Sequence, residues 1–439
     1  MNACHKHIST LLMRTEAICR TAIRYTSVIS RGNGMKLDSP EFHGIFTPGL
    51  QTLQEIFKKY NYEIRIAGGA VRDLLKRKVP NDIDFATTAT PSEMQKMFST
   101  ENIRMINTKG EKHGTITARI KDQNFEVTTL RIDKITDGRH AEVEFTKDWV
   151  IDAERRDLTI NSMFLGLDGT VYDFFNGREH LDKCDVRFVG DPTQRIQEDY
   201  LRILRYFRFF GRISPKPDGH SAHTLQAIRE NAEGLAKISG ERIWMELQKI
   251  LVGNHAAHIV RCMYELGLAE FIGLPTNGNL DCLGAVCERS CGLEPKPITI
   301  LVALLHNDQD VLKIVERMKT SVDERKLAMF IVNNREDKEN GSILKSLQDI
   351  IVANTGKEKN IVPYVCEIFK YRGEKANLDA IVNWTIPVFP VSGKDLLAAG
   401  VPRGKELGKI LDRMKMKWTD SNYKLNRDEI MTILPEIRL

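Results

Sequence analysis

Hydrophobic and polar positions alternate along several short runs in the first part of the chain. Residues 62–67, 83–87, 115–120 and 125–132 have the two-residue period of strands, and 121–124 between the last two is a hairpin signature. Residues 50–60 and 70–78 have the spacing of amphipathic helices, and Thr90-Pro91-Ser92-Glu93 is a capping box for a further helix. This part of the chain therefore predicts a small mixed β-sheet with helices.

After about residue 180 the strand signal fades and a helical period of apolar residues takes over. Breaks rich in Pro, Gly or charge are expected at 214–219, 275–279, 293–297 and 335–341. We predict an α+β N-terminal head followed by an all-α neck, body and tail. The predicted boundaries are 35–180 for the head, 181–275 for the neck, 276–375 for the body and 376–439 for the tail.

The composition is that of a globular protein of several domains. The chain has 439 residues, of which 42% are apolar and 28% charged, so wholesale disorder and fibrous folds are excluded. No run approaches the ~20 apolar residues of a membrane span. Eight cysteines are too sparse for a disulfide scaffold, and the cluster of Cys282, Cys287 and Cys291 lacks the paired spacing of zinc modules.

Basic charge is concentrated at the N-terminus. The net charge is +5, and residues 1–34 contain Lys6 and four arginines against Glu16 alone. This segment is also amphipathic and rich in Ser and Thr, which predicts a mitochondrial transit peptide; a disordered basic arm is the alternative. A start at Met35 would give a second, cytosolic or nuclear form.

Two carboxylates are the sharpest chemical feature. Asp82 and Asp84 stand two residues apart in a predicted strand, so both side chains leave the same face. Adjacent carboxylates repel unless a cation lies between them, and oxygen ligands suit Mg²⁺. A D-x-D pair alone is common in surface turns, but the apolar neighbours Ile83 and Phe85 favour a buried strand.

A glycine pair lies just upstream, in G-G-A-V-R-D at residues 68–73. Glycines where a strand meets a helix let backbone N–H groups approach a phosphate, and Arg72 would add a charged contact. Taken alone, the motif is better explained as a turn that needs positive φ.

Together these motifs resemble the head of the polymerase-β-type nucleotidyltransferases. More narrowly, the chain resembles the class II tRNA nucleotidyltransferases, the CCA-adding enzymes, and their bacterial poly(A) polymerase relatives. Further motifs follow in the family's order: R-R-D-x-T-x-N at 155–161, D-x3-G at Asp173 and Gly177, E-D-x-L-R-x-x-R at 198–205 and S-x-E-R-x3-E at 239–246. The match is dense over roughly residues 60–255.

The resemblance implies addition of CCA to the 3′ end of tRNA from CTP and ATP, with release of pyrophosphate. Two Mg²⁺ ions would be held by Asp82 and Asp84, with Glu126 as a possible third carboxylate. The alternatives are a poly(A) polymerase, a partial CC- or A-adding transferase, and a non-catalytic RNA-binding protein. Intact metal carboxylates argue against the last of these.

Asp199 and Arg202 are the predicted base readers. We expect them three residues apart on one face of a helix that begins near Glu198. Asp only accepts hydrogen bonds and Arg only donates, a pattern that fits the amino group and bare ring nitrogen shared by cytosine and adenine. Without the other motifs, an intrahelical salt bridge would be the default explanation.

The remaining site residues follow from the resemblance. Residues implied to bind the nucleotide are Gly69, Arg72, Arg155, Arg156, Arg205 and Arg208, the last two in a stripe along the helix, and those implied to support the site are Asp157, Asn161, Glu241, Arg242 and Glu246. Residues 136–147 resemble the family's mobile loop. In the tail, Lys394, Arg403, Lys405 and Lys409 are expected to contact tRNA phosphates, although a solvated helix face is as good an explanation for any single lysine. The protein is expected to be a monomer or a homodimer without membrane contact.

Overall fold

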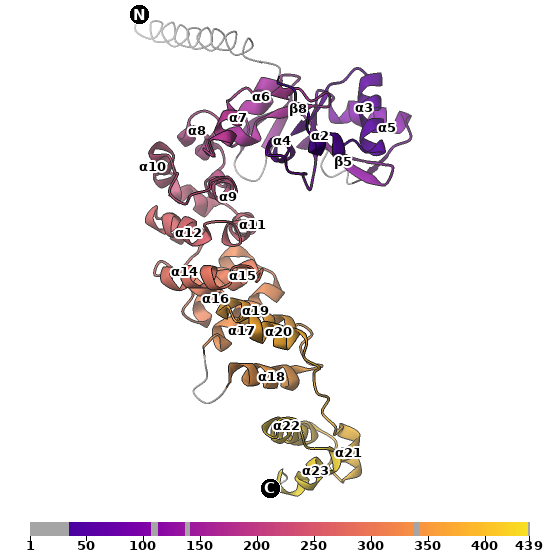
Figure 1. The fold of residues 1–439 in the computed structure, drawn as a ribbon, viewed down its shortest axis with the longest axis vertical. Coiled ribbons are helices and arrows are strands. Elements are labelled where there is room, and N and C mark those ends of the chain that lie inside the picture. Colours follow the sequence, from indigo (N-terminus) through magenta and orange to yellow (C-terminus); the bar gives the residue numbers. More distant parts are fainter. Residues whose placement is uncertain (1–34, 107–112, 137–140, 337–341, 438–439) are drawn as a thin grey trace, which may run out of the picture. The chain divides into compact units, whose positions relative to one another are not determined.

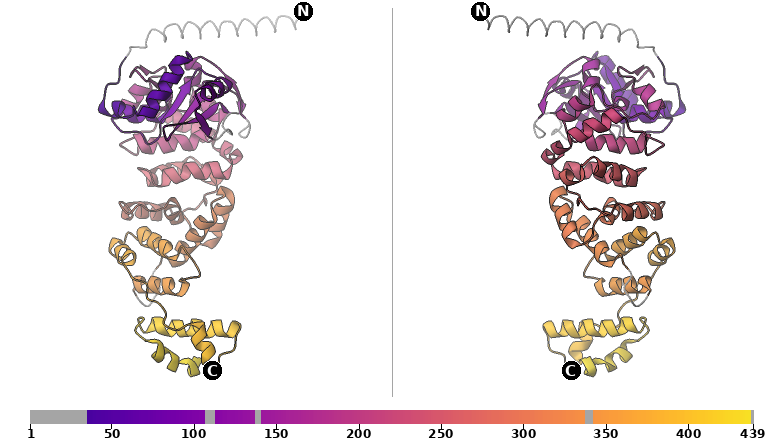
Figure 2. Two further views of the ribbon diagram at one scale, coloured as in Figure 1. Left: turned by 90° about the vertical axis from the view of Figure 1, so that its right-hand side faces the viewer. Right: turned by 90° about the vertical axis from the view of Figure 1, so that its left-hand side faces the viewer.

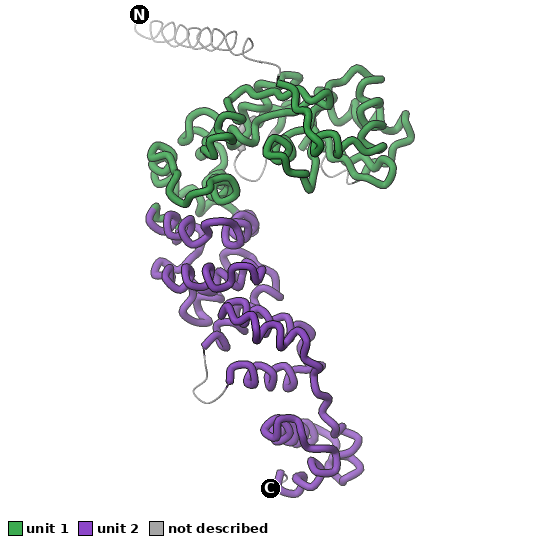
Figure 3. Tube along the Cα trace, viewed as in Figure 1, with its two compact units in different colours: residues 1–238, 266–268 green, residues 239–265, 269–439 purple. Residues whose placement is uncertain are grey.

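A computed structural model describes residues 35–106, 113–136, 141–336 and 342–437. The predicted transit peptide, residues 1–34, lies outside these ranges. The chain divides into two compact units, residues 1–238 with 266–268 and residues 239–265 with 269–439 (Figure 3). The division falls inside the segment predicted as the neck, and the predicted domain boundaries stay predictions.

Unit 1 is built on the mixed sheet that the sequence predicts (Figure 1). Its strands, in spatial order, are β3 (Arg104–Ile106), β4 (Thr115–Ile120), β5 (Gln123–Thr129), β2 (Asp84–Thr87), β1 (Ile64–Ala67), β8 (Phe164–Gly166) and β9 (Val171–Tyr172). Only β2 and β5 pair in parallel; the other neighbours are antiparallel. The α+β head is thus confirmed.

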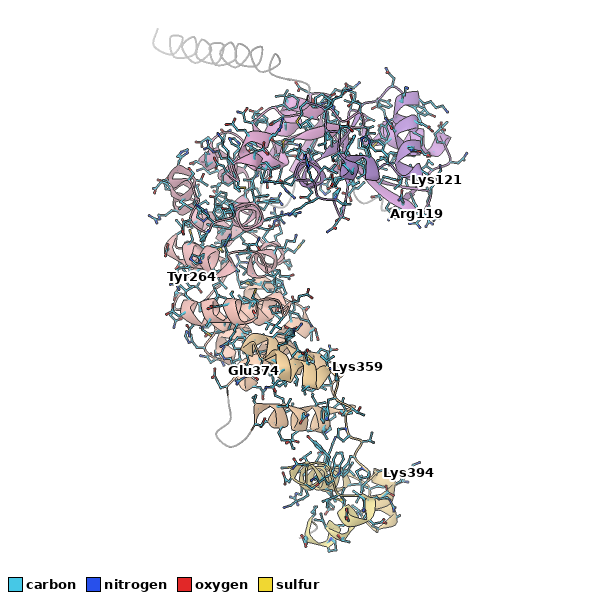
Figure 4. The ribbon with its side chains drawn as sticks, in the orientation of Figure 1. Arg119, Lys121, Tyr264, Lys359, Glu374 and Lys394 are labelled. Carbon is cyan, nitrogen blue, oxygen red and sulfur yellow. The ribbon has the colours of Figure 1, made fainter. Side chains whose placement is uncertain are left out.

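The predicted hairpin joins β4 to β5 through Lys121 and Asp122, whose φ angles of 46° and 64° are those of a tight two-residue turn. Figure 4 labels Arg119 and Lys121 at this turn. The predicted single strand over 125–132 was wrong. β5 ends at Thr129, and β6 (Arg131–Thr136) pairs with β7 (Ala141–Phe145) in a separate two-stranded sheet. Part of the segment expected as a loop is therefore strand, and residues 137–140 lie outside the described ranges.

Unit 1 also contains helices, some of which pack on the sheet. The others follow the sheet in the chain, up to the C-terminal end of unit 1. The helical elements of unit 1 are α2 (Pro40–Gly44), α3 (Pro48–Lys59), α4 (Gly69–Leu75), α5 (Pro91–Thr100), α6 (Trp149–Glu154), the 3₁₀ turn η2 (Thr159–Asn161), α7 (Gly177–Asp182), α8 (Pro192–Glu198), α9 (Arg202–Ile213), α10 (Ala222–Glu230) and η3 (Ala232–Lys237). The capping box of α5 is confirmed: Glu93 N–H donates to Thr90 Oγ1 (3.3 Å), and Thr90 N–H donates to Glu93 Oε2 (2.7 Å). Phe57 of α3 and Phe98 of α5 contact edge to face beside the sheet, with ring centroids 6.0 Å apart.

Unit 2 is helical throughout its described residues, as predicted. Its elements are α11 (Gly240–Leu251), α12 (Ala256–Glu265), α13 (Ala269–Ile272), α14 (Leu280–Arg289), α15 (Pro297–Leu301), η4 (Val302–Leu304), α16 (Asp308–Met318), α17 (Val322–Asn334), α18 (Ile343–Asn354), α19 (Ile361–Arg372), α20 (Lys375–Val382), α21 (Gly393–Ala398), α22 (Lys405–Asp420), α23 (Arg427–Thr432) and α24 (Leu434–Ile437). Figure 2 shows helices that are consecutive in the chain lying side by side. The breaks expected at 214–219 and 275–279 fall between helices, and the one at 293–297 ends at the first residue of α15. Most of the break expected at 335–341 lies outside the described ranges. In the part of the chain that the structure describes, no helix has the length and apolar character needed to cross a bilayer.

The last helices of unit 2 enclose a small core of their own. Leu396 of α21, Ile410 and Trp418 of α22, and Ile430 of α23 are all buried in it. These apolar residues lie on one side of α21 and α22, which leaves the basic residues of both helices in solvent, except for the half-buried Lys415.

Candidate active site

Asp84 is the first residue of β2 and lies in a row of residues that crosses the sheet. Its register partners are Ala67 on β1 and Glu126 on β5, and Ala67 is in turn opposite Phe164 on β8. Residues in register share a face, so Asp84, Glu126 and Phe164 lie on the same side of the sheet. The guanidinium of Arg156 lies 4.7 Å from the centre of the Phe164 ring, which brings this arginine to the face that carries Asp84.

Asp82 lies two residues before β2 rather than inside a strand, which corrects the prediction that both carboxylates project from it. The two carboxylates are nevertheless electrostatic neighbours. Burial and the negative charge of Asp82 raise the pKa of Asp84, and the positive charge of Arg156 partly offsets this rise. Two carboxylates that repel each other in this way fit a divalent cation, which would relieve the repulsion.

Glu126 is coupled to the same pair, because burial and the charge of Asp84 raise its pKa. Within the described ranges, however, no three His, Cys, Asp or Glu side chains are arranged to hold an ion together. Glu126 is therefore a neighbour of Asp84 in register and does not complete a three-ligand group.

The glycine pair forms the bend between β1 and α4. Gly68 has φ 66° and ψ −123°, a conformation that strains any other residue, so the turn requirement expected from the sequence is real. A Cβ atom on Gly68 would lie 3.5 Å from Arg156 Nη1, and one on Gly69 would lie 3.4 Å from Arg72 Nη2. The bend thus lies against two of the predicted nucleotide-binding arginines.

A chain of side-chain contacts links three of the motifs. Arg72 is 2% exposed and donates through Nη1 to Asn161 Oδ1 (2.7 Å). Asn161 Nδ2 donates to Asp157 Oδ1 (3.2 Å), and Arg205 Nε donates to Asp157 Oδ2 (2.6 Å). Burial alone would raise the pKa of Asp157, but Arg205 and the Asn161 hydrogen bond hold it below its ordinary value. Asp157 and Asn161 therefore connect Arg72 with Arg205, two of the arginines predicted to bind the nucleotide.

Phe209 on α9 is a residue that the sequence analysis missed. The guanidinium carbons of Arg208, Arg72 and Arg205 lie 4.3, 5.2 and 5.6 Å from the centre of its ring. An aromatic face attracts cations, so one ring keeps three guanidinium groups close together. The sequence does show an aromatic residue beside each arginine of the stripe. Aromatic residues at these positions are equally expected on an ordinary buried helix face, so they did not single out Phe209.

Asp199 was wrongly placed in a helix. It follows the end of α8 with φ −154° and ψ 105°, and α9 begins only at Arg202. Asp199 Oδ1 accepts from the Leu201 backbone N–H (3.1 Å). The E-D-x-L-R-x-x-R segment therefore contains the turn that joins α8 to α9. Asp199 precedes this turn and Arg202 follows it, so the two residues do not share one helical face.

Arg202 is held by three acceptors near this turn. Its Nη1 donates to Glu198 Oε2 (2.6 Å) and to the Arg195 carbonyl (2.9 Å), and its Nη2 donates to the Arg155 carbonyl (3.0 Å). The last bond ties the start of α9 to the R-R-D motif.

The D-x3-G motif stabilises the start of α7 through hydrogen bonds to backbone N–H groups. Asp173 Oδ1 accepts from Gly177 N–H (2.8 Å), and Oδ2 accepts from Arg178 N–H (2.9 Å), at the first turn of α7. A Cβ on Gly177 would lie 2.2 Å from the Thr159 carbonyl oxygen, so only glycine lets α7 approach η2. This approach fixes η2, which ends at Asn161.

The other predicted residues belong to unit 2. Glu241, Arg242 and Glu246 lie on α11, where Glu246 is 5% exposed and Glu241 and Arg242 lie closer to solvent. Lys394 on α21, labelled in Figure 4, is exposed, as are Arg403, Lys405 and Lys409. Lys394 and Arg403 line an open groove of about 630 Å³ between α21 and α22, together with Ser392, Leu397 and Leu407.

Known proteins resemble this chain in sequence. Residues 64–187 match the poly A polymerase head domain, and residues 221–275 match the probable RNA and SrmB-binding site of polymerase A. The chain is 55% identical to the mitochondrial CCA tRNA nucleotidyltransferase 1 of Homo sapiens, over 91% of this chain and 93% of the relative. The corresponding protein of Danio rerio is 54% identical over 92% and 94%.

The fold is also similar to that of a solved structure. The crystal structure of the Bacillus stearothermophilus CCA-adding enzyme in complex with CTP matches with a TM-score of 0.74 and 25% identity, over 91% of this chain and 98% of that one. Enzymes of this family generally use a divalent metal, which the Asp82–Asp84 pair suits. By its sequence and its fold, the chain belongs to the family of CCA-adding tRNA nucleotidyltransferases.

Proposed function

We propose that this protein is a CCA tRNA nucleotidyltransferase, which adds C, C and A to the 3′ end of tRNA from CTP and ATP without a nucleic-acid template and releases pyrophosphate. The observation that carries the proposal is that the charges of Asp82 and Arg156 both act on Asp84 while Arg156 also lies against the Gly68 bend, in a chain of this family. A protein that only binds RNA needs no repelling carboxylate pair beside phosphate-binding groups.

Asp82 and Asp84 are the catalytic carboxylates and would hold two Mg²⁺ ions. When bound, these ions supply activation of the tRNA 3′-hydroxyl and neutralisation of the leaving pyrophosphate. The carboxylates contribute charge at a fixed place, because Asp84 is anchored by strand pairing on both sides. Most of the rate enhancement is then positioning and electrostatics.

The triphosphate is held by the arginines around the glycine bend. Gly69 is the first residue of α4 and lies next to Arg72, since a Cβ there would be 3.4 Å from Arg72 Nη2. Arg205 and Arg208 converge with Arg72 on Phe209, so their positive charges act together. Arg155 and Arg156 supply further charge from the R-R-D motif, and guanidinium groups match phosphate oxygens with paired donors.

Base choice rests on Asp199 and Arg202 at the junction of α8 and α9. The three hydrogen bonds of Arg202 within the protein use three of its five N–H groups and leave Nε–H and one Nη2–H for a base. The Asp199 carboxylate accepts from the exocyclic amino group of cytosine or adenine. Guanine and uracil present the opposite pattern, and each unsatisfied buried group costs about 1–3 kcal/mol.

Transfer RNA is bound partly by the tail. Lys394, Arg403, Lys405 and Lys409 place exposed positive charge on and beside α21 and α22. Such charges neutralise backbone phosphates without reading sequence. We assign Glu241, Arg242 and Glu246 a supporting role on α11.

The protein acts in mitochondria, as the names of its animal relatives and the basic N-terminal segment both support. A cytosolic or nuclear form that starts at Met35, and the choice between monomer and homodimer, stay predictions.

The test uses the full chain and a tRNA that lacks its 3′ CCA, with each nucleoside triphosphate alone and then CTP with ATP. The expected products are two added C residues with CTP alone, one further A with both, and none with UTP or GTP. Long adenosine tails would replace this proposal by a poly(A) polymerase. Addition of A directly to the truncated tRNA would indicate a partial transferase.

A further inference from the structure

Asp152 on α6 is buried beneath the two arginines of the R-R-D motif, and no motif assigns it a role. Its side chain is 1% exposed. Asp152 Oδ1 accepts from Arg155 Nε (2.8 Å) and lies 2.7 Å from Arg155 Nη2. Asp152 Oδ2 accepts from Arg156 Nε (3.2 Å) and Nη2 (3.0 Å). Each carboxylate oxygen therefore holds the Nε–Nη2 edge of a different guanidinium.

The arrangement leaves the Nη1 atom of each guanidinium facing a different neighbour. Arg156 Nη1 donates to the Asn161 carbonyl (3.2 Å) and lies beside the Gly68 bend. Arg155 Nη1 lies 3.5 Å from Asp133 Oδ2 on β6. Without the carboxylate, two adjacent guanidinium groups would repel each other.

Asp152 stays ionised in this environment. Burial alone would raise its pKa, but the charges of Arg156 and Arg155 and the Arg131 backbone N–H hold the pKa below its ordinary value. A buried carboxylate with this many donors has low freedom to move, so it fixes the direction of both arginines.

We propose that Asp152 is a positioning residue for the reaction: it orients Arg155 and Arg156 toward the triphosphate of the incoming nucleotide and does not touch the nucleotide itself. The inference rests on the proposed function. Because the triphosphate is common to CTP and ATP, loss of Asp152 affects both nucleotides equally and leaves the choice of base unchanged.

The test is Asp152→Asn in the full-length protein, with KM and kcat measured separately for CTP and ATP on the matching tRNA substrates. The amide keeps the shape but places an N–H₂ group against one guanidinium, so that arginine must turn away. KM should rise about tenfold or more for both nucleotides by the same factor, with rejection of UTP and GTP retained. Asp148→Asn is the matched control: Asp148 caps the same helix through the Val150 and Ile151 N–H groups, and its replacement should leave both KM values unchanged.

A combined variant distinguishes the positioning role of Asp152 from a purely structural role. In an Arg155→Ala/Arg156→Ala background, Asp152→Asn should add less than about twofold to the loss already present, because the groups it orients are gone. Full additivity, a KM within about twofold of the parent value in folded Asp152→Asn, or unequal effects on CTP and ATP would each overturn the proposal.

If Asp152→Asn does not fold, Asp152→Glu keeps the charge and moves both guanidinium groups by one methylene; it should raise both KM values by a smaller common factor, and unchanged values would contradict the role. Failure of the parent protein to add CCA would defeat the proposed function, whereas parent activity with an indifferent Asp152 would defeat only this inference.

Discussion

Asn161 joins Arg72 to Asp157: its side-chain oxygen accepts from Arg72 Nη1 at 2.7 Å and its side-chain nitrogen donates to Asp157 Oδ1 at 3.2 Å. Through Asp157 the connection reaches Arg205 on α9. One amide therefore couples the helix after the glycine bend to the arginine stripe. An amide is suited to this place because it donates on one side and accepts on the other.

Asn161→Ala is predicted to weaken both nucleotide binding and folding. The change removes one hydrogen bond from buried Arg72, which keeps Asp73, and one from buried Asp157, which keeps Arg205. A donor or acceptor left unsatisfied in a buried place costs about 1–3 kcal/mol. The KM for CTP and ATP should rise in parallel with a fall in the urea midpoint. Asn124→Ala is the control, because the exposed Asn124 side chain accepts from Arg119 at the β4–β5 hairpin; equal effects of the two changes would contradict the coupling.

Gly177→Ala should destabilise unit 1. Its Cβ would lie 2.2 Å from the Thr159 carbonyl oxygen, and overpacking of this kind costs about 1–3 kcal/mol. The matched change is Gly408→Ala in α22, where no atom lies within 4 Å of the new Cβ and the helix gains about 0.5–1 kcal/mol. Chemical denaturation of the two variants should shift the midpoints in opposite directions; a Gly177→Ala protein as stable as the parent would show that α7 does not need this approach.

His220 should make the stability of unit 1 depend on pH. Its ring stacks on Phe210 with centroids 3.7 Å apart, and Nδ1 lies 2.9 Å from the Tyr206 hydroxyl. Burial lowers the pKa of His220 to about 4, against the opposing charge of Asp218. Between the unfolded value near 6.5 and the folded value, the unfolded chain binds a proton that the folded chain does not, so stability falls as pH falls through this window.

The measurement is the melting temperature at about pH 7.5 and about pH 5 for the parent and for His220→Phe. The parent should lose more stability than the variant between these values, since phenylalanine does not titrate. The same loss in both proteins would assign the pH dependence to other groups.

Asp199→Ala should relax base choice without abolishing transfer. The change removes the acceptor for the amino group shared by cytosine and adenine, so the preference for CTP over UTP should fall by about tenfold or more. Single-nucleotide incorporation into truncated tRNA measures the ratio. Glu233→Ala, an exposed acidic residue of η3 in the same unit, serves as the control, and an unchanged CTP/UTP ratio in Asp199→Ala would refute the assignment of base reading.

Local signals predicted the framework because each acts within a few residues. The capping box at Thr90, the strand over 115–120 and the breaks at 214–219 and 275–279 all depend on neighbouring residues, and these are confirmed. The sheet order was not available from such signals. Pairing of β2 with β5 joins segments about forty residues apart, and nothing local to either strand specifies it.

The sequence motifs predicted which residues belong to the candidate site, but not how those residues contact one another. Asp199 carries a helical pattern on both sides, so its extended conformation between α8 and α9 had no local signal. Asp152 and Phe209 were missed because each has an ordinary local explanation, a helix-face carboxylate and an apolar helix position. Their roles depend on partners that only the folded chain brings together, such as the Arg72 guanidinium 5.2 Å from the Phe209 ring.

The most direct test of the account compares Asp84→Asn with Asp122→Asn in the addition of CCA to truncated tRNA. Asp84 begins β2 and lies close to the charge of Asp82, whereas Asp122 is exposed in the β4–β5 turn, where asparagine tolerates the same positive φ. The account predicts that Asp84→Asn loses transfer of both C and A by a factor of about a thousand or more while still binding tRNA, and that Asp122→Asn retains parent activity. Transfer at near-parent rates by Asp84→Asn would contradict the central claim that this carboxylate pair catalyses the reaction.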